Sequence, residues 1–283
     1  MDSQRQSKLT LGVVVAATAI VVALVIALIV AMASGGDDSD DTAAAPPPPA
    51  SPSEPAPSDS QPPGDETTDV DPTGRQVTVV DSIGGTPREQ TGAPGQFPEG
   101  QEMVGAPEGL ELQRVQSGAT LMVSRSDGPD SVDDGVMTGY ARSPGGAALV
   151  AANFMGLGME MGGAYADFLT RFMPDQVAED PEFIDEIRSR GASVDGRALM
   201  AAEGYQAPRW FRFGQCDETF CTVEGAMPSI AEAVGEVQSG DVDPRDHTVM
   251  RVSMKWADDQ WEIVSAQPLT PVRDIDGTWS PWN

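Results

Sequence analysis

The chain has 283 residues, of which 44 are acidic and 17 are basic, so its formal net charge is −27. Binding to a nucleic-acid backbone or to an anionic lipid surface needs a basic patch, and this composition argues against both kinds of partner. The length is sufficient for one or two ordinary domains.

The first segment with a clear signal is residues 9–34, which contain no charge and no proline. A helix of about twenty apolar residues spans the hydrocarbon core of a bilayer, so this segment predicts a transmembrane helix. Arg5 and Lys8 precede it and the acidic run GGDDSDD follows it. This charge distribution predicts a plasma-membrane protein with residues 1–8 as a cytoplasmic head and everything after the span outside the cytoplasm.

A cleaved signal peptide is the alternative, because the sequence AMA at residues 31–33 fits a cleavage site. The apolar part of a signal peptide is typically about 7–15 residues long, which is shorter than this segment and favours a retained anchor. Cleavage would instead release a secreted protein. No cysteine lies near the end of the span, which excludes a lipoprotein anchor.

Small residues recur every four positions within the span, at Ala19, Ala23, Ala27 and Ala31. Such spacing lets two helices approach closely in lipid, so we expect the span to contact a second copy or a partner span. The frequent use of alanine in bacterial spans would give the same pattern.

Residues 35–105 are rich in Pro, Gly and Asp, and include the run AAAPPPPASPSEPAPSDSQPPGD. A segment with so few apolar residues and charge of one sign is expected to be a disordered, partly extended linker. Within it, residues 77–80 (VTVV) predict a short strand and residues 84–105 predict a loop. The folded domain is then expected at residues 106–283, which is long enough for a sizeable core.

Helix and strand signals follow one another in this domain. Residues 110–124 predict two strands about a turn at Ser117 and Gly118. Three helices are expected: one that begins at Ser143 and Pro144, one over residues 164–173, and one capped by Asp180. Two hairpins follow, over residues 208–227 and 248–267, and residues 229–238 predict a short helix or a loop. Helices followed by antiparallel strands indicate an α+β domain, with the helices packed on an antiparallel sheet.

The apolar stretch SPGGAALVAANFMGLGMEMGG, residues 143–163, allows three interpretations. Asn153, Glu160 and its several glycines argue against a second membrane span. Its G-x-G lies inside a helix and not between a strand and a helix, which argues against a nucleotide loop. We therefore expect the central helix of the domain, with a small face formed by Ala147, Ala148, Ala151 and Ala152 against the sheet. The glycines after Met155 predict a loose or broken end.

Cys216 and Cys221 are the two cysteines of the chain and lie at the facing ends of the first predicted hairpin. Outside the cytoplasm, this pair predicts one disulfide. The alternative, a metal or redox pair, is disfavoured by the C-x4-C spacing and by the lack of a second Cys or His pair.

No motif in the sequence indicates catalysis. His247 is the single histidine and has no recognisable nucleophile setting, so a structural role at a strand start is expected. Asp241, Asp243 and Asp246 lack the glycine and the distal glutamate of an EF-hand loop. We therefore expect no cofactor, no metal and no enzymatic activity.

Residues 124–154, SRSDGPDSVDDGVMTGYARSPGGAALVAANF, resemble a segment of uncharacterised actinobacterial envelope proteins. Those proteins share the Ser, the Gly-Pro, the aromatic GYA and the Pro-x-Gly-Ala-Ala helix start. They also share one span, a Pro-rich linker and a closing W…W hairpin, matched here by KWADDQWEIVSAQP. Many are encoded near mobile elements and conjugation genes. This chain departs from them at Leu110, where relatives often have tryptophan.

The order of helices and then hairpins is also similar to the cone-shaped fold of nuclear transport factor two. Periplasmic domains of conjugation assembly factors use that fold. These resemblances imply an interaction or assembly module in a secretion or conjugation apparatus, with protein partners and no nucleic acid. Neither resemblance assigns a functional residue.

Two hypotheses follow from the sequence. The first is a non-enzymatic, membrane-anchored interaction module, with Trp279 and Trp282 as a candidate contact patch for a partner. Burial of both rings in the domain's own core is the alternative for these tryptophans. The second hypothesis is a ligand-binding or enzymatic cone domain whose pocket is closed by the Gly/Met-rich helix. A deep pocket with convergent polar groups would favour the second, and an exposed apolar patch the first.

Overall fold

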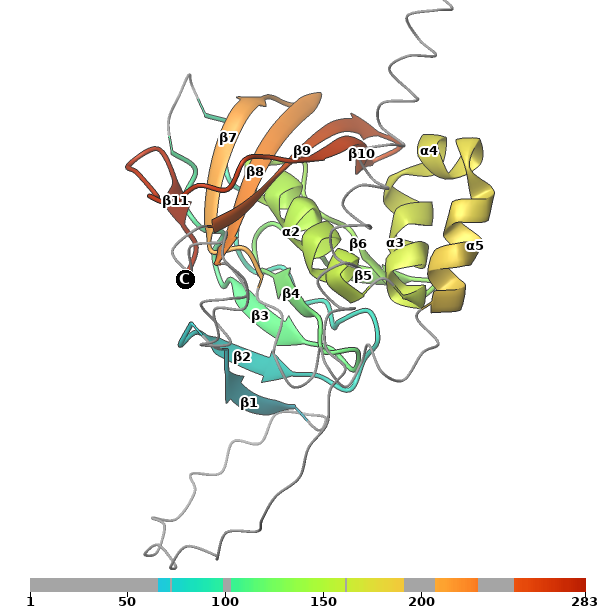
Figure 1. Ribbon diagram of the computed structural model, residues 1–283. Coiled ribbons are helices and arrows are strands. Elements are labelled where there is room, and N and C mark those ends of the chain that lie inside the picture. The colour runs from blue at the N-terminus through green and yellow to red at the C-terminus, as the bar shows by residue number, and fades with distance from the viewer. Residues whose placement is uncertain (1–65, 72, 99–102, 161, 191–206, 229–246) are drawn as a thin grey trace, which may run out of the picture. The chain divides into compact units, whose positions relative to one another are not determined.

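The computed structural model describes residues 66–71, 73–98, 103–160, 162–190, 207–228 and 247–283 (Figure 1). The chain divides into two compact units, Met1–Gly64 and Asp65–Asn283, and all the described residues belong to the second. In the described part, no helix combines the length and apolarity needed to cross a membrane. The predicted span, the cleavage site and the segment at residues 229–238 lie outside the described residues.

The first sheet contains four strands in the order β1-β2-β3-β4. They are β1 (Thr67–Val70), β2 (Gln76–Val79), β3 (Glu111–Arg114) and β4 (Thr120–Val123). β2 runs parallel to β3, and the other neighbours are antiparallel. The predicted hairpin over residues 110–124 and the short strand at residues 77–80 are confirmed.

The expected linker boundary at residue 105 is wrong, because residues 66–98 are part of the folded domain. Val77 and Val80 are buried in the main core. The loop after β2 is held by polar side chains of the sheet. Gln113 accepts from the Thr86 N–H at 2.8 Å and donates to the Thr86 carbonyl at 2.8 Å. Arg88 donates two hydrogen bonds to Glu111, at 2.9 and 2.7 Å. A loop fixed in this way needs few apolar residues, and its composition therefore resembles that of a linker.

The second sheet is fully antiparallel, in the order β10-β9-β8-β7-β11. Its strands are β7 (Trp210–Cys216), β8 (Phe220–Pro228), β9 (His247–Ala257), β10 (Gln260–Pro268) and β11 (Ser280–Pro281). Both predicted hairpins are confirmed, and Trp256 faces Trp261 across the second one. A separate small hairpin joins β5 (Ser131–Asp133) to β6 (Val136–Thr138).

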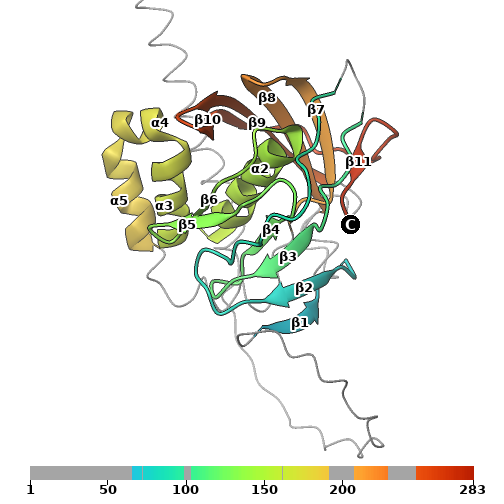
Figure 2. The same cartoon turned by 180° about the vertical axis from the view of Figure 1, so that it is seen from behind.

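The helices are α2 (Pro144–Glu160), α3 (Gly163–Phe172), α4 (Pro174–Glu179) and α5 (Pro181–Arg190). α2 contacts β4 on one side and β8, β9 and β10 on the other, so it lies between the two sheets (Figures 1 and 2). α3 packs on α2, and α5 packs on α3. The domain is α+β as expected, with helices packed on the antiparallel second sheet. The first sheet, which was not expected as a separate layer, covers α2 on the opposite side.

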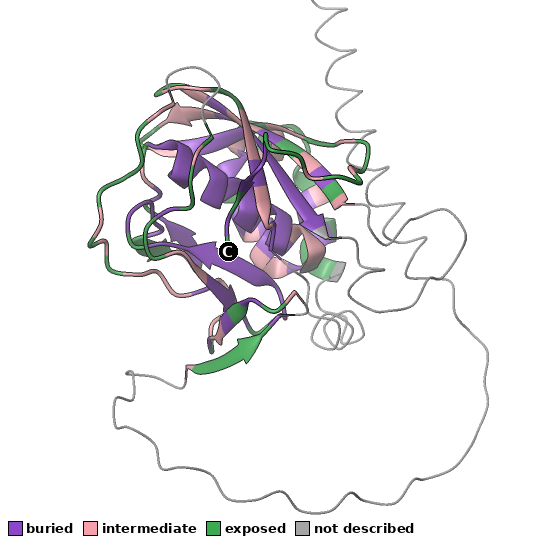
Figure 3. Ribbon diagram, turned by 90° about the vertical axis from the view of Figure 1, so that its left-hand side faces the viewer, coloured by how far each residue is buried: buried purple, intermediate pink, exposed green. Residues whose placement is uncertain are grey.

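The position of α2 between two sheets explains its unusual sequence. A helix that is apolar on all sides is stable where all sides are buried. Residues 143–157 are all buried (Figure 3), and the four alanines of the predicted small face are fully so. The Ser143 hydroxyl accepts from the Gly146 N–H at 3.0 Å, which confirms the predicted N-cap. The Asp180 carboxylate likewise accepts from the Phe183 N–H at 3.1 Å.

The predicted loose end after Met155 is wrong, because α2 continues to Glu160. Gly156 lies where the helix backbone comes close to β4, since a Cβ there would be 2.6 Å from the Thr120 carbonyl oxygen. A Cβ at Gly158 would meet only the ring of Tyr165, at 3.6 Å, an ordinary van der Waals distance. Gly156 is therefore explained by the close packing of α2 against β4, and not by an interruption of the helix.

Two glycine-to-alanine substitutions in α2 are expected to act in opposite directions. Alanine favours a helix by about 1 kcal/mol over glycine, so Gly158→Ala should raise the melting temperature. Gly156→Ala forces the helix away from β4 at a cost of about 1–3 kcal/mol, which offsets that gain and lowers the melting temperature. Thermal unfolding monitored by circular dichroism measures both variants. An equal rise in both would contradict the close contact between α2 and β4.

Cys216 and Cys221 form the predicted disulfide across the end of the β7–β8 hairpin. The tip is also held without it. The Asp217 carboxylate accepts from the backbone N–H groups of Thr219 at 2.8 Å and Phe220 at 3.0 Å. These hydrogen bonds, first those from Thr219, lower the pKa of Asp217 to about 2. Arg142 donates to the Glu218 carbonyl at 2.7 Å.

Removal of the disulfide is expected to weaken the domain without unfolding it. Closure of so short a loop stabilises a protein by about 2 kcal/mol in the chain-entropy account. Reduction, or the double change Cys216→Ser and Cys221→Ser, should therefore lower the melting temperature by roughly 4–8 °C. Scanning calorimetry with and without reductant gives the value. A melting temperature that does not respond to reductant would show that the bond adds nothing.

Candidate functional site

The candidate contact patch at Trp279 and Trp282 is wrong, because both rings are buried. Trp279 is 4% exposed and packs with Ala226 and Val249, whereas Trp282 is fully buried and stacks near Phe211. The alternative interpretation, that the rings cover the domain's own core, is correct. His247 is half-buried at the start of β9, and its ring lies edge-on to Trp210 at 4.7 Å.

Within the segment that carries the family resemblance, residues 126–129 form a buried connection to the start of α2. The Asp127 carboxylate accepts hydrogen bonds from the hydroxyls of Ser126 and Ser143 and from the Gly95 N–H. Asp127 is 1% exposed and lies against the first turn of the helix, whose N-terminus favours negative charge. The Ala141 carbonyl accepts from the Trp261 indole N–H at 3.0 Å, which joins the segment to the second sheet. Residues 126–129 and 143–154 of this segment are buried and have a structural role, whereas residues 130–135 are exposed.

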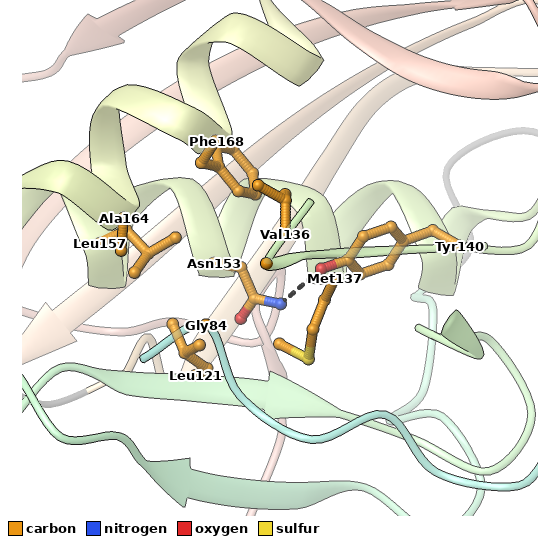
Figure 4. A pocket seen from close by; sticks show the side chains of 10 residues that line it. Gly84, Leu121, Val136, Met137, Tyr140, Asn153, Leu157, Ala164 and Phe168 are labelled. Atoms are coloured by element: carbon orange, nitrogen blue, oxygen red, sulfur yellow. Dashed lines mark hydrogen bonds between the residues drawn. The ribbon is translucent and has the colours of Figure 1, made fainter. Parts of the chain in front are cut away.

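A small cavity lies beside α2 and is lined by Asn153, Tyr140 and Phe168, among others (Figure 4). Asn153 bonds both the N–H and the carbonyl of Met122, at 2.7 and 3.0 Å, and donates to the Tyr140 hydroxyl at 2.9 Å. Burial raises the pKa of Tyr140, although the hydrogen bond from Asn153 opposes this effect. The volume available to the centre of a water molecule is about 10 Å³, so the cavity has no room for an organic ligand.

A much larger open groove, of about 670 Å³, lies where the ends of several strands meet. β2 and β3 are parallel and begin at the same end of the first sheet, and β4 ends there. The segment before β7 and the end of the chain close the other side. These elements bring together Arg75, Arg125 and Arg209, which are far apart in the sequence.

Arg75 fixes one wall of this arginine-lined groove. Its guanidinium donates to the Asp71 carboxylate at 2.9 Å and to the carbonyls of Ala207 and Pro208 at 2.8 and 3.1 Å. Burial lowers the pKa of Arg75, Asp71 opposes this shift, and the positive charge of Arg209 adds to it. The Asp71–Arg75 pair therefore joins the start of the first sheet to the segment that carries Arg209.

Arg125 and Arg209 extend from fixed backbone. The carbonyl of Arg125 accepts from the N–H groups of Thr91 and Gly92, both at 2.9 Å, and its exposed side chain passes over Gly109. A Cβ at Gly109 would be 2.8 Å from the Arg125 Cγ, so the glycine leaves room for the side chain.

Arg209 is similarly held. Its guanidinium carbon lies 5.2 Å from the centre of the Trp210 ring. Its Nε donates to the Asn283 side chain at 2.9 Å. Both contacts orient the guanidinium before any ligand is present.

Arg125 and Arg209 differ from most other basic residues that the structure describes. Most of the described basic side chains form an ion pair with a carboxylate. They are those of Arg75, Arg88, Arg114, Arg142, Arg171, Arg188, Arg212, Arg251 and Lys255. Within the same described residues, Arg125 and Arg209 have no carboxylate partner. Arg125 and Arg209 line the same groove, in a chain that is strongly acidic.

The groove is suited to binding an anion. Among the described residues, its single acidic lining residue is Glu111, which is already paired with Arg88. Burial raises the pKa of Glu111, but the hydrogen bonds from Arg88 outweigh this effect and hold it below its ordinary value. Guanidinium groups match the planar geometry of carboxylates and phosphates. No group of residues among those described has the composition of a metal site.

Sequence reasoning missed this groove. Its three arginines come from segments that are far apart in the sequence. The pairing of β2 with β3 and the docking of β7 bring them together. The absence of carboxylates within two positions of Arg209 was a visible but weak signal.

Comparison with protein families shows a match. The model of the family DUF8175, described as a domain of unknown function, matches residues 78–281. The chain belongs to the DUF8175 family. No curated protein and no solved structure matches it. The DUF8175 match begins within β2, in the region first expected to be linker, and it includes Arg125 and Arg209.

Proposed function

We propose that this DUF8175 protein is a single-span membrane protein whose extracytoplasmic domain is a non-enzymatic interaction or assembly module. The observation that carries the proposal is the arginine-lined groove. It is open, the guanidinium groups of Arg75 and Arg209 are held by hydrogen bonds, and Arg125 and Arg209 have no carboxylate partner among the described residues.

The membrane topology in this proposal rests on residues 9–34 and on the basic residues before them. The Cys216–Cys221 disulfide supports an oxidising compartment for the domain, since disulfides are rare in the cytosol. The antiparallel sheet with α2 against it supports the cone-like arrangement. The resemblance to actinobacterial envelope proteins adds a secretion or conjugation apparatus as the setting.

The rival function, a ligand pocket closed by the Gly/Met-rich helix, has less support. The cavity beside α2 has room for about one water molecule, and α2 is packed against both sheets. The large exposed apolar side chains of the described residues, Val70, Ile83, Met103, Val132 and Val264, come from separate segments. Neither a deep pocket nor one apolar patch is therefore the leading feature.

Two measurements test the proposal. Intact cells are treated with a protease that does not cross the membrane, and an extracytoplasmic domain should be degraded while a cytoplasmic marker is not. Affinity purification of the full chain from its native membrane should then recover envelope proteins of a secretion or conjugation system. Protection of the domain from protease would refute the topology, and recovery of no envelope component would refute the assembly role.

A further inference from the structure

We propose that the arginine-lined groove binds an acidic segment of a partner protein, through salt bridges from Arg125 and Arg209 to its Asp or Glu carboxylates. This inference rests on the proposed function and names the chemistry of the partner.

The charges of the groove give the first argument. Among the described residues, the charged side chains of its lining are those of Arg75, Arg125 and Arg209 and of one acidic residue, Glu111, in a chain whose net charge is −27. Arg75 and Glu111 are each occupied by a partner, Asp71 and Arg88 respectively. The groups left to meet a ligand are thus Arg125 and Arg209, both positive.

Preorganisation gives the second argument. Nε of Arg209 is used by Asn283, and its ring contact with Trp210 orients the remaining N–H groups. The side chain of Arg125 has space over Gly109, and its backbone is fixed by hydrogen bonds from Thr91 and Gly92. Ordering the Arg209 side chain and the Arg125 backbone in advance reduces the entropy lost on binding.

Size and lining favour a peptide over a small anion or a polyanion. A volume of about 670 Å³ far exceeds that of one phosphate, and Leu110 adds partly exposed apolar surface to the lining, behind which Leu112 and Trp282 are buried. A nucleic acid needs a long basic track, whereas most other described basic side chains are neutralised by carboxylates. A short segment with carboxylates and intervening small or apolar side chains fits both features.

The test uses the full chain in detergent and a fluorescein-labelled peptide of alternating Glu and Ser, about ten residues long and roughly 33 Å when extended. A matched peptide has Gln at every Glu. Fluorescence anisotropy should show binding of the Glu peptide only, and this binding should weaken as salt is raised. The overall negative charge of the protein repels the Glu peptide, so any binding must be local.

The variant Arg125→Gln/Arg209→Gln should bind the Glu peptide about tenfold or more weakly than the wild type. Arg188→Gln is the control, because Arg188 is half-exposed on α5 and pairs with Asp167. The single variant Arg125→Gln changes only an exposed side chain, so it tests the groove even if the change at Arg209 disturbs folding. It should weaken binding as well. Melting temperatures of all variants are measured in parallel.

Three results would overturn the inference. They are equal binding of the Glu and Gln peptides, wild-type binding by the folded double variant, and competition by inorganic phosphate as effective as that by unlabelled Glu peptide. The last would indicate a small-anion site. If the double variant still recovers the same envelope proteins from the membrane, the inference fails and the proposed function stands. If the wild type recovers none, the proposed function itself fails.

Discussion

Replacement of Asn153 by alanine is expected to lower the melting temperature by roughly 6–12 °C, because the change removes partners from buried polar groups. The side-chain amide of Asn153 completes the inner edge of β4 by bonding the N–H and carbonyl of Met122. Without it, those two groups and the Tyr140 hydroxyl lose a hydrogen bond in the core. Each such loss costs about 1–3 kcal/mol, so the total is about 3 kcal/mol or more.

Tyr140→Phe is the graded control for this prediction. It removes one of the three hydrogen bonds and leaves the pairing of Asn153 with Met122 intact. We expect it to cost about 1 kcal/mol, as is typical of a single hydrogen bond. Calorimetry should therefore give the highest melting temperature for the wild type, a lower one for Tyr140→Phe and the lowest for Asn153→Ala. If both variants lose the same amount of stability, the hydrogen bonds between Asn153 and Met122 of β4 do not contribute to the stability of the domain.

Replacement of Asp71 by asparagine is expected to have a comparable effect. Asp71 and Arg75 have side chains that are 2% and 6% exposed, so the change leaves a buried guanidinium without its counter-charge. Breaking a buried pair from one side costs about 3–5 kcal/mol. Because Arg75 also bonds the carbonyls next to Arg209, we expect weaker binding of the Glu peptide too.

Asp69→Asn is the matched control for Asp71→Asn. Asp69 lies two positions earlier and pairs with Arg114, but its side chain is 54% exposed. Exposed ion pairs contribute little, so the melting temperature of this variant should stay close to that of the wild type. A similar loss in both variants would contradict the special role of the buried pair.

The effect of Asp71→Asn should also depend on pH. Burial raises the pKa of Asp71, but hydrogen bonds from Thr73 and Arg75 outweigh it and hold the pKa below 3.8. The ionised carboxylate therefore stabilises the fold fully above pH 3.8, and this stabilisation is lost as the pH falls through the lowered pKa. The difference in melting temperature between wild type and variant should be largest near neutral pH and shrink below pH 3.8.

Local signals in the sequence were sufficient for the individual elements. Ser143 and Asp180 cap the helices they were expected to cap, and the alternation about residues 258 and 259 marks a real hairpin. Cys216 and Cys221 lie opposite each other at the facing ends of the hairpin, as expected, after a register shift between Phe213 and Cys216. These features depend on neighbours in sequence.

Features that depend on distant contacts could not be predicted in this way. The loop containing Thr86 has a linker's composition and is ordered by Gln113 of the sheet. From the sequence, Gly156 predicts an interruption of the helix, whereas in the structure it allows α2 to pack closely against β4. The burial of Trp282 and the meeting of Arg125 with Arg209 likewise result from the docking of separate elements.

The most direct test of the account is photo-crosslinking in living cells. A benzophenone amino acid at Gln76, an exposed position in the groove, should give an adduct with an envelope protein whose crosslinked segment is rich in Asp and Glu. The same probe at Ala178, exposed on α4, should not give this adduct. The adduct should disappear in the Arg125→Gln/Arg209→Gln background. An adduct that persists in that background, or no adduct at Gln76, would contradict the assignment of the groove as the partner-binding surface.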